Sequence, residues 1–180
     1  ALASQLVARG ASVALSARGE DALRRIASDA CTSAPGRALV LPFDAIQPGQ
    51  WAQAHHKLVA VWGGVDVVVF CAGAYAPMRA WEIDERQTSN IVDVNLRSVY
   101  HGLELVIPEL RADGTGALVL VASVAGLVGL PNATVYGPTK AALINLAETL
   151  FLDLRPQGVG VSVVNPGFVD TPLTAQNTFR

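Results

Sequence analysis

The segment that decides the fold reads Ala117-Leu-Val-Leu-Val-Ala-Ser-Val-Ala-Gly-Leu-Val-Gly-Leu-Pro-Asn-Ala-Thr-Val-Tyr-Gly-Pro-Thr-Lys140. Residues 117–122 form an apolar run that is typical of a parallel strand buried on both faces. Ser123 therefore stands where a buried strand ends, which is where open α/β sheets bind their ligands. The apolar residues that follow, 141–154, predict a long helix.

Tyr136 and Lys140 are four residues apart, and Pro138 between them suits the first turn of a helix, where a missing N–H group costs nothing. At this spacing the two side chains share one face of the helix. A phenol has a pKa of about 10, and an adjacent ammonium group lowers that pKa because it favours the phenolate. The pair is a candidate acid/base device, although the same spacing also occurs on exposed helices without any catalytic role.

The composition bounds the class of protein. The chain has 180 residues, of which 51% are hydrophobic and 16% charged, and these values fit one domain with a large buried core. A net charge of −2 gives no electrostatic attraction for nucleic acid or an anionic membrane. With two cysteines, no signal segment, no membrane-spanning run and no metal-binding cluster in its sequence, the protein is expected to be cytoplasmic, with no metal.

Strands and helices alternate along the chain. The expected strands are 11–17, 37–42, 65–70, 116–122 and 159–164, and the expected helices are 1–9, 20–31, 50–62, 84–112 and 136–154. This alternation predicts an α/β fold with a doubly wound, mostly parallel sheet, in a single domain that spans residues 1–180. Because the chain opens inside a helix and stops after Arg180 without a closing element, we expect a fragment of a longer protein.

Several motifs in this order resemble the classical short-chain dehydrogenase/reductase family, and the resemblance covers essentially the whole chain. The motifs are Cys71-Ala72-Gly73, Asn95, Ser123, Tyr136-Gly-Pro-Thr-Lys140, Asn165-Pro166-Gly167 and Asp170-Thr171-Pro172. Ser123 precedes Tyr136 by thirteen residues, as the family pattern requires. The resemblance implies a Rossmann-type sheet whose first strand and Gly-rich turn should lie before Ala1. We expect this polypeptide alone to fold poorly and to be inactive.

The resemblance also implies a reaction, namely hydride transfer between NAD(P)(H) and an alcohol or carbonyl substrate. In the family's scheme, Tyr136 donates a proton to the carbonyl oxygen or removes one from the hydroxyl group. Lys140 lowers the pKa of Tyr136 and holds the nicotinamide ribose. Ser123 hydrogen-bonds the substrate oxygen, and Asn95 organises a water chain that leads to Lys140.

The implied cofactor contacts are Arg18, Asp44, Cys71, Ala72, Gly73, Tyr136, Lys140, Pro166, Gly167 and Thr171. Asp44 matches the family's adenine-contacting acid, but capping of a turn is an equal alternative. Phe70 and Cys71 occupy the places of two asparagines in the family's usual Asn-Asn-Ala-Gly. Arg18 favours NADP over NAD because a guanidinium suits the 2′-phosphate and Ala17 offers no carboxylate for the ribose. NAD and a merely solvated Arg18 are the alternatives.

The expected partner is a small alcohol or carbonyl compound. The segments that should line its pocket are 74–78, 124–131 and 173–180, which are mainly apolar and small. The apolar helices 91–110 and 141–154 imply a homodimer or homotetramer when the protein is complete. Two alternatives are a non-catalytic dinucleotide-sensing or protein-binding member of the family and a flavodoxin-like binding domain. Ser123, Tyr136 and Lys140 together favour the enzyme.

Overall fold

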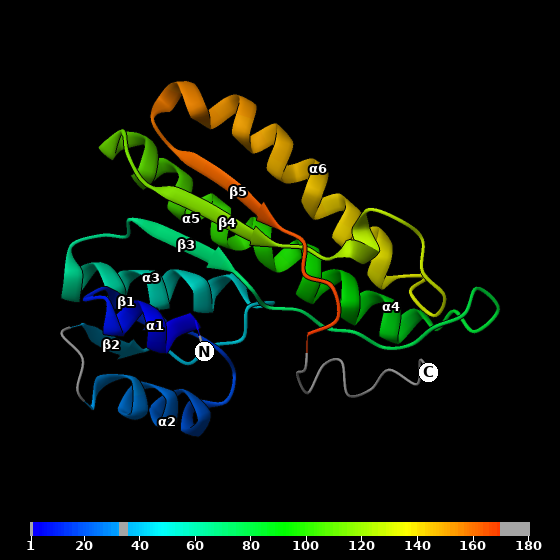
Figure 1. Ribbon diagram of the computed structural model, residues 1–180, viewed down its shortest axis with the longest axis horizontal. Helices are drawn as coiled ribbons and strands as arrows, with labels where there is room; N and C mark the ends of the chain where they lie inside the picture. Colours follow the sequence, from blue (N-terminus) through cyan, green and yellow to red (C-terminus); the bar gives the residue numbers. More distant parts are fainter. Residues whose placement is uncertain (1, 33–35, 170–180) are drawn as a thin grey trace. The chain divides into compact units, whose positions relative to one another are not determined.

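The computed structural model describes residues 2–32 and 36–169 and divides into two compact units, Ala1–Gly64 and Val65–Arg180 (Figure 1). Thr171 and the segment 173–180, to which the sequence assigned cofactor and substrate contacts, lie outside the described residues. Among the helices that are described, none is long and apolar enough to cross a membrane.

The first unit is built on two parallel strands. Its elements are α1 (Leu2–Ala8), β1 (Ser12–Leu15), α2 (Glu20–Cys31), β2 (Arg37–Val40) and α3 (Pro48–Trp62). The strands pair in register with Ser12 opposite Arg37, and α2 forms the crossover between them, as the alternating pattern predicts. The buried residues of α2 are Leu23 and Ala30, which lie on one face of the helix.

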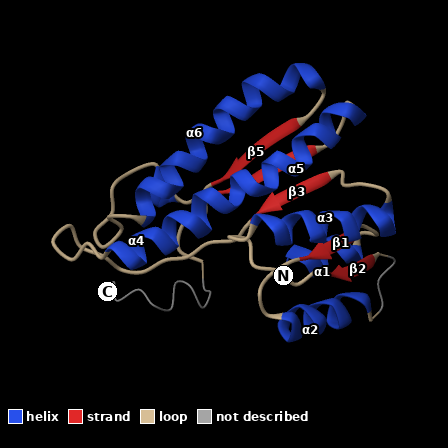
Figure 2. Ribbon diagram, turned by 180° about the vertical axis from the view of Figure 1, so that it is seen from behind, coloured by secondary structure: helices blue, strands red, loops and turns tan. Residues whose placement is uncertain are grey.

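The second unit contains a three-stranded parallel sheet in the order β3-β4-β5. Its elements are β3 (Val67–Phe70), α4 (Glu85–Val92), the π-helical turn η1 (Asp93–Arg97), α5 (Ser98–Asp113), β4 (Ala117–Val121), the short 3₁₀ helix η2 (Val124–Gly126), α6 (Tyr136–Leu154), the 3₁₀ helix η3 (Arg155–Gln157) and β5 (Gly160–Val164). Figure 2 shows α5 and α6 on the same face of this sheet.

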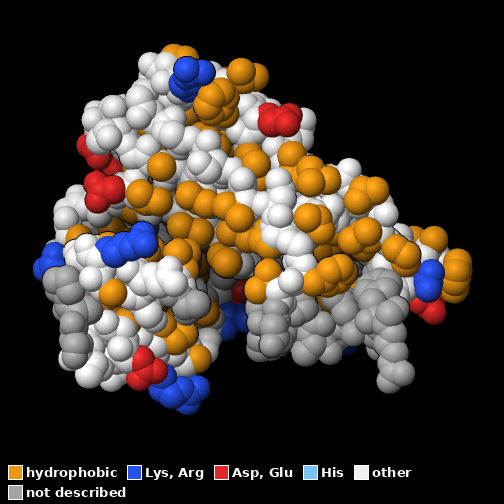
Figure 3. All heavy atoms as spheres, in the orientation of Figure 1, with side chains coloured by type: hydrophobic (Ala, Val, Ile, Leu, Met, Phe, Trp, Pro, Cys, Tyr) orange, Lys and Arg blue, Asp and Glu red, His pale blue; other side chains and the backbone are white. Residues whose placement is uncertain are grey.

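The centre of this sheet is β4, where Leu118 and Leu120 are fully buried. The two outer strands are less buried, since Val67 on β3 is 53% exposed and Val164 on β5 is 46% exposed. Figure 3 shows apolar side chains at the surface over these strands. Within this unit β4 has a strand neighbour on each side, whereas β3 and β5 each pair with β4 alone.

The helix expected over 84–112 is interrupted. It is divided into α4 and α5 by the π-helical turn η1, which has Asn95 at its middle. A π turn places one extra residue in the helix, and such turns occur frequently at functional sites. The interruption turns Asn95 into the interior of the unit, where its side chain is fully buried.

Helix α6 has the predicted boundaries, Tyr136–Leu154, with Pro138 in its first turn. Leu143, Ala147 and Leu150 are buried along one side of it, while Leu152 is 72% exposed. Within the single chain, therefore, packing does not cover all of the apolar surface of this helix. Its sheet-facing side is covered, and part of its apolar surface is left open.

Candidate active site

Ser123 and Tyr136 meet at the carboxyl end of β4. Ser123 is the N-cap of η2, and its Oγ accepts a hydrogen bond from the backbone N–H of Ala125 at 3.2 Å. Tyr136 is the first residue of α6, and a side-chain hydrogen bond links it to Ser123. Burial raises the pKa of Tyr136 above its usual value, and the hydrogen bond with Ser123 acts against that rise. The predicted serine–tyrosine pair is therefore assembled.

Lys140 lies beside this pair on the buried side of α6. It is 4% exposed, its Nζ donates to the backbone oxygen of Val121 at 2.9 Å, and Nζ lies 5.6 Å from the centre of the Tyr136 ring. Burial lowers the pKa of Lys140, whereas the nearby Cys71 thiol acts to raise it. The expected lowering of the Tyr136 pKa by Lys140 is not the net result, because burial of the phenol outweighs the factors that lower its pKa.

Asn95 connects the loop after β3 to the start of α6. Its Oδ1 accepts from the backbone N–H of Ala74 at 2.7 Å, and its Nδ2 donates to the backbone oxygen of Ala74 at 3.0 Å. The same Nδ2 donates to Oγ1 of Thr139 at 3.0 Å. The Thr139 hydroxyl in turn donates to the backbone oxygen of Tyr136 at 2.7 Å. Asn95 is therefore fully bonded within the protein and fixes both neighbouring segments.

Gly126 allows η2 to pack directly on the backbone of α6. A Cβ atom at this position would lie 2.7 Å from the carbonyl carbon of Lys140 and 2.8 Å from the backbone nitrogen of Ala141. Distances this short displace one of the two backbones. Because Ser123 immediately precedes η2 and Tyr136 begins α6, the close approach at Gly126 sets the distance between the two hydroxyl groups.

Cys71, Ala72 and Gly73 follow β3 and are all exposed. A Cβ atom built on Gly73 would lie 3.7 Å from both Asn95 Oδ1 and Lys140 Nζ, which is ordinary van der Waals contact, so Gly73 lies close to both side chains. Cys71 is a free cysteine that lies near enough to Lys140 to raise the pKa of its amine. The predicted residues Cys71, Gly73, Asn95 and Lys140 are thus brought together at one edge of the sheet.

The loop after β5 closes the same edge. The backbone N–H of Val124 donates to the oxygen of Pro166 at 3.1 Å, and that of Ala122 donates to the oxygen of Val164 at 2.8 Å. Pro166 and Gly167 are therefore held next to the segment that carries Ser123. The Oδ1 atom of Asn165 is buried and has no hydrogen-bond donor among the described residues. Asn165 belongs to a motif that the sequence analysis names, but no contact is predicted for it there.

Residues 1–179 match the family model described as short chain dehydrogenase. The chain belongs to this family. An oxidoreductase of Staphylococcus epidermidis is 31% identical over 179 residues, which are 99% of this chain and 76% of that protein. D-beta-hydroxybutyrate dehydrogenase of Rhizobium meliloti is 30% identical over 174 residues, covering 96% of this chain and 67% of the relative.

The fold is shared with solved structures of the family. The alcohol dehydrogenase of the archaeon Thermococcus sibiricus, complexed with 5-hydroxy-NADP, superimposes with a TM-score of 0.89 at 26% identity. The superposition covers 99% of this chain and 75% of the archaeal one. The prediction of a Rossmann-type α/β fold with parallel strands is confirmed by this likeness together with the observed strand pairing.

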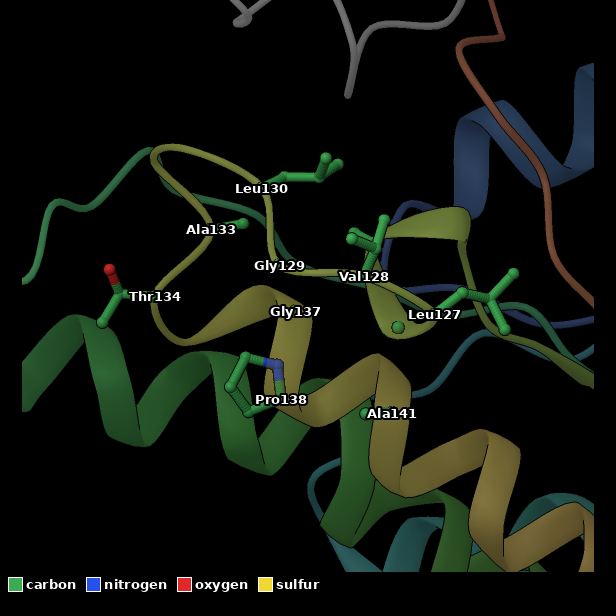
Figure 4. Close-up of a pocket in the computed structure, with 11 residues that line it drawn as sticks. Leu127, Val128, Gly129, Leu130, Ala133, Thr134, Gly137, Pro138 and Ala141 are labelled. Carbon is green, nitrogen blue, oxygen red and sulfur yellow. The ribbon is translucent and has the colours of Figure 1, made fainter.

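A pocket of about 370 Å³ lies between the loop that follows η2 and the first turns of α6. Figure 4 shows the loop that follows η2 arching over the start of α6. The lining residues are 125–130, Ala133, Thr134, Gly137, Pro138 and Ala141. The predicted pocket segment 124–131 thus does line a cavity, whereas 74–78 and the Ser123 and Tyr136 side chains do not belong to it.

Two predicted cofactor residues of the dehydrogenase belong to the first unit. Arg18 follows β1 and is exposed. Asp44 caps a turn, because its Oδ1 accepts from the backbone N–H of Ile46 at 3.3 Å and its own N–H donates to Gln50 Oε1 at 2.8 Å. The turn-capping alternative for Asp44 is therefore observed, and an adenine contact would be an additional role.

Proposed function

We propose that the protein is an NADP-preferring oxidoreductase that transfers a hydride between NADP(H) and an alcohol or carbonyl substrate. The two units belong to one dinucleotide-binding domain in this proposal. The observation that carries it is the hydrogen-bonded pair of Ser123 and Tyr136 beside a buried lysine amine. A hydroxyl donor and a tuned phenol are what a carbonyl group needs for polarisation and protonation.

In the proposed mechanism, Ser123 and Tyr136 act on the substrate oxygen. The Ser123 hydroxyl donates to the substrate oxygen and stabilises the negative charge that develops there. Tyr136 gives its proton to this oxygen in reduction and takes a proton from it in oxidation. Because burial raises the pKa of Tyr136, the phenol is protonated near neutral pH and ready to act as an acid.

Lys140 and the loops around it form the proposed nicotinamide site. NADP(H), when bound, supplies or accepts the hydride. Gly73 lies close to the Lys140 amine, so a ribose hydroxyl group bound to that amine would also approach the Gly73 backbone, and the unpartnered Asn165 Oδ1 suits an amide donor. The proposed contacts in the second unit are Cys71, Ala72, Gly73, Tyr136, Lys140, Pro166, Gly167 and Thr171. Asn95 supports this site indirectly, because its side chain binds the backbone of Ala74 and so fixes the loop that contains it.

Arg18 and Asp44 are the proposed contacts for the other end of the dinucleotide. Arg18 is exposed, so its guanidinium is accessible to a 2′-phosphate. The structural relative from Thermococcus sibiricus is complexed with 5-hydroxy-NADP, which supports the choice of NADP over NAD for this chain. Asp44 is placed at the adenine, in addition to its capping of the turn.

Arg18→Ala tests the cofactor preference. We expect the ratio of kcat/KM for NADPH to that for NADH to fall about tenfold or more, because a charge-assisted contact to the 2′-phosphate is lost. Arg25→Ala, which removes an exposed arginine from the same unit, serves as the control and should leave the ratio unchanged. If Arg18→Ala also preserves the ratio, the assignment of Arg18 is wrong.

Leu152→Asp tests the proposed self-association through α5 and α6. Leu152 is 72% exposed on α6 and Tyr100 is 51% exposed on α5, so burial of this surface against a second copy would remove apolar area from water. We expect sedimentation velocity to show a homodimer or homotetramer for the unaltered protein and a smaller species for Leu152→Asp. Leu127→Asp, at a residue that is 63% exposed but outside both helices, is the control. A monomeric unaltered protein would contradict the proposal.

The experiment that tests the function is an NADPH oxidation assay with a panel of aldehydes and ketones, on the protein as its gene encodes it. Turnover of at least one carbonyl compound, with NADPH used in preference to NADH, is the expected result. Dinucleotide binding without turnover of any member of the panel, or of the corresponding alcohols with NADP, would favour the non-catalytic sensing function instead.

A further inference from the structure

Tyr75 presents a second phenol ring to Tyr136. The centres of the two rings are 5.2 Å apart and their planes are inclined by 81°, which is an edge-to-face contact of the kind that aromatic pairs prefer. Tyr75 lies in the connection between β3 and α4, far from Tyr136 in the sequence. In the sequence analysis, Tyr75 belongs only to the predicted pocket-lining segment 74–78, and no individual role is predicted for it.

The backbone around Tyr75 is fixed on both sides. On one side, both backbone groups of Ala74 are bonded to the buried Asn95 side chain. On the other, the N–H of Met78 donates to the oxygen of Asn132 at 2.9 Å, and the oxygen of Met78 accepts from Thr134 Oγ1 at 2.7 Å. Met78 is itself 2% exposed. The Tyr75 ring is therefore held by anchors that also fix the segment leading into α6.

We propose that Tyr75 is a positioning residue for Tyr136: its ring packs against the Tyr136 phenol, keeps that phenol turned toward Ser123 and screens it from water. The proposal rests on the function of Tyr136 as the proton donor and acceptor. It assigns a role to the ring of Tyr75, and the hydroxyl group of Tyr75 is not required for it.

The electrostatics agree with this geometry. Burial is the main factor that raises the pKa of Tyr136. The pKa of Tyr75 is also raised, first by burial and then by the charge of Tyr136. Without the Tyr75 ring, water reaches the Tyr136 phenol and stabilises its phenolate, and the pKa of Tyr136 falls toward its usual value of about 10.

The kinetic test compares Tyr75→Ala, Tyr75→Leu and Tyr75→Phe. We expect the first two to lower kcat about tenfold with the KM for NADPH within about twofold, because the phenol loses its fixed orientation. Tyr75→Phe keeps the ring and should recover kcat to within about threefold of the unaltered protein. Trp81→Ala removes an exposed aromatic ring, 79% accessible, from the same connection and is the control for a general effect on the loop.

The pH profile separates positioning from a loss of stability. Reduction needs the protonated phenol, so its rate falls as pH rises through the pKa of Tyr136. A lower pKa in Tyr75→Ala and Tyr75→Leu moves this fall to lower pH, whereas Tyr75→Phe leaves it in place. Variants with kcat within about twofold of the unaltered protein, or a Tyr75→Phe as slow as Tyr75→Ala, would overturn the proposal.

A direct measurement does not depend on turnover. The 180-residue sequence contains Tyr75, Tyr100 and Tyr136, and in a Tyr100→Phe background the tyrosinate signal of Tyr136 is the difference between each variant and the same variant with Tyr136→Phe. Absorbance after a rapid pH jump should give a lower ionisation midpoint for Tyr136 with Tyr75→Leu than with Tyr75→Phe. Equal midpoints would refute the screening by Tyr75. A shifted midpoint in a protein that reduces no carbonyl compound would instead refute the catalytic function and leave the ring contact standing.

Discussion

Tyr136→Phe is expected to lower kcat/KM for NADPH-dependent reduction by about a thousandfold, because a positioned general acid contributes 10²–10⁴-fold to such a rate. The phenyl ring keeps its contact with Tyr75 and its place beside the Lys140 amine, so the site retains its shape. NADPH binding, measured by fluorescence, should therefore change by less than about threefold. The loss would appear in kcat.

The matched control for this variant is Tyr100→Phe. Tyr100 is 51% exposed, so the same atom is removed from a phenol outside the proposed site. Tyr100→Phe should turn over like the unaltered protein. Turnover of Tyr136→Phe near the level of that control would remove Tyr136 from the mechanism, and with it the hypothesis of a tyrosine acid/base.

Gly126→Ala is expected to reduce kcat/KM about a hundredfold and to lower the free energy of unfolding by about 2 kcal/mol. The added Cβ would lie 2.7–2.8 Å from backbone atoms of Lys140 and Ala141, and no flexible side-chain end is there to give way. η2 must move away from α6, which separates the Ser123 hydroxyl from the Tyr136 phenol. Steady-state kinetics and urea unfolding measure the two effects.

Gly129→Ala in the same loop is the control for this variant. No atom lies within 4 Å of a Cβ built there, so the same substitution should change activity and stability little. If Gly126→Ala behaves like Gly129→Ala, the contact of η2 with α6 does not set the geometry of the site. A stability loss without any loss of activity would limit Gly126 to a structural role.

The elements that the sequence predicts best are those with a strong local signal. The boundaries of α6 agree with the prediction, because Pro138 marks the first turn and an unbroken apolar run follows. The prediction for α2 also agrees with the structure. By contrast, the π turn around Asn95 leaves no local signal, since it is stabilised by bonds to Ala74 and Thr139, which are distant in sequence.

In the candidate site, too, features with a local sequence signal are predictable and features that depend on distant residues are not. The spacing of Tyr136 and Lys140 predicts that they share a helix face, and they do. Whether the pKa of Tyr136 rises or falls depends mainly on how deeply its phenol is buried. The local motif Tyr136–Lys140 does not specify that burial. The ring of Tyr75 and the orphaned Asn165 Oδ1 become visible only when separate loops are brought to one edge of the sheet.

In the proposed function, hydride moves between NADP(H) and a carbonyl carbon at this site. Its most direct test is mass spectrometry of the alcohol formed from a carbonyl compound and NADPH deuterated on the transferred position of the nicotinamide. The account predicts an alcohol that carries deuterium on its former carbonyl carbon and that is not formed by Tyr136→Phe. An unlabelled alcohol, or equal labelled product from Tyr136→Phe, would contradict it.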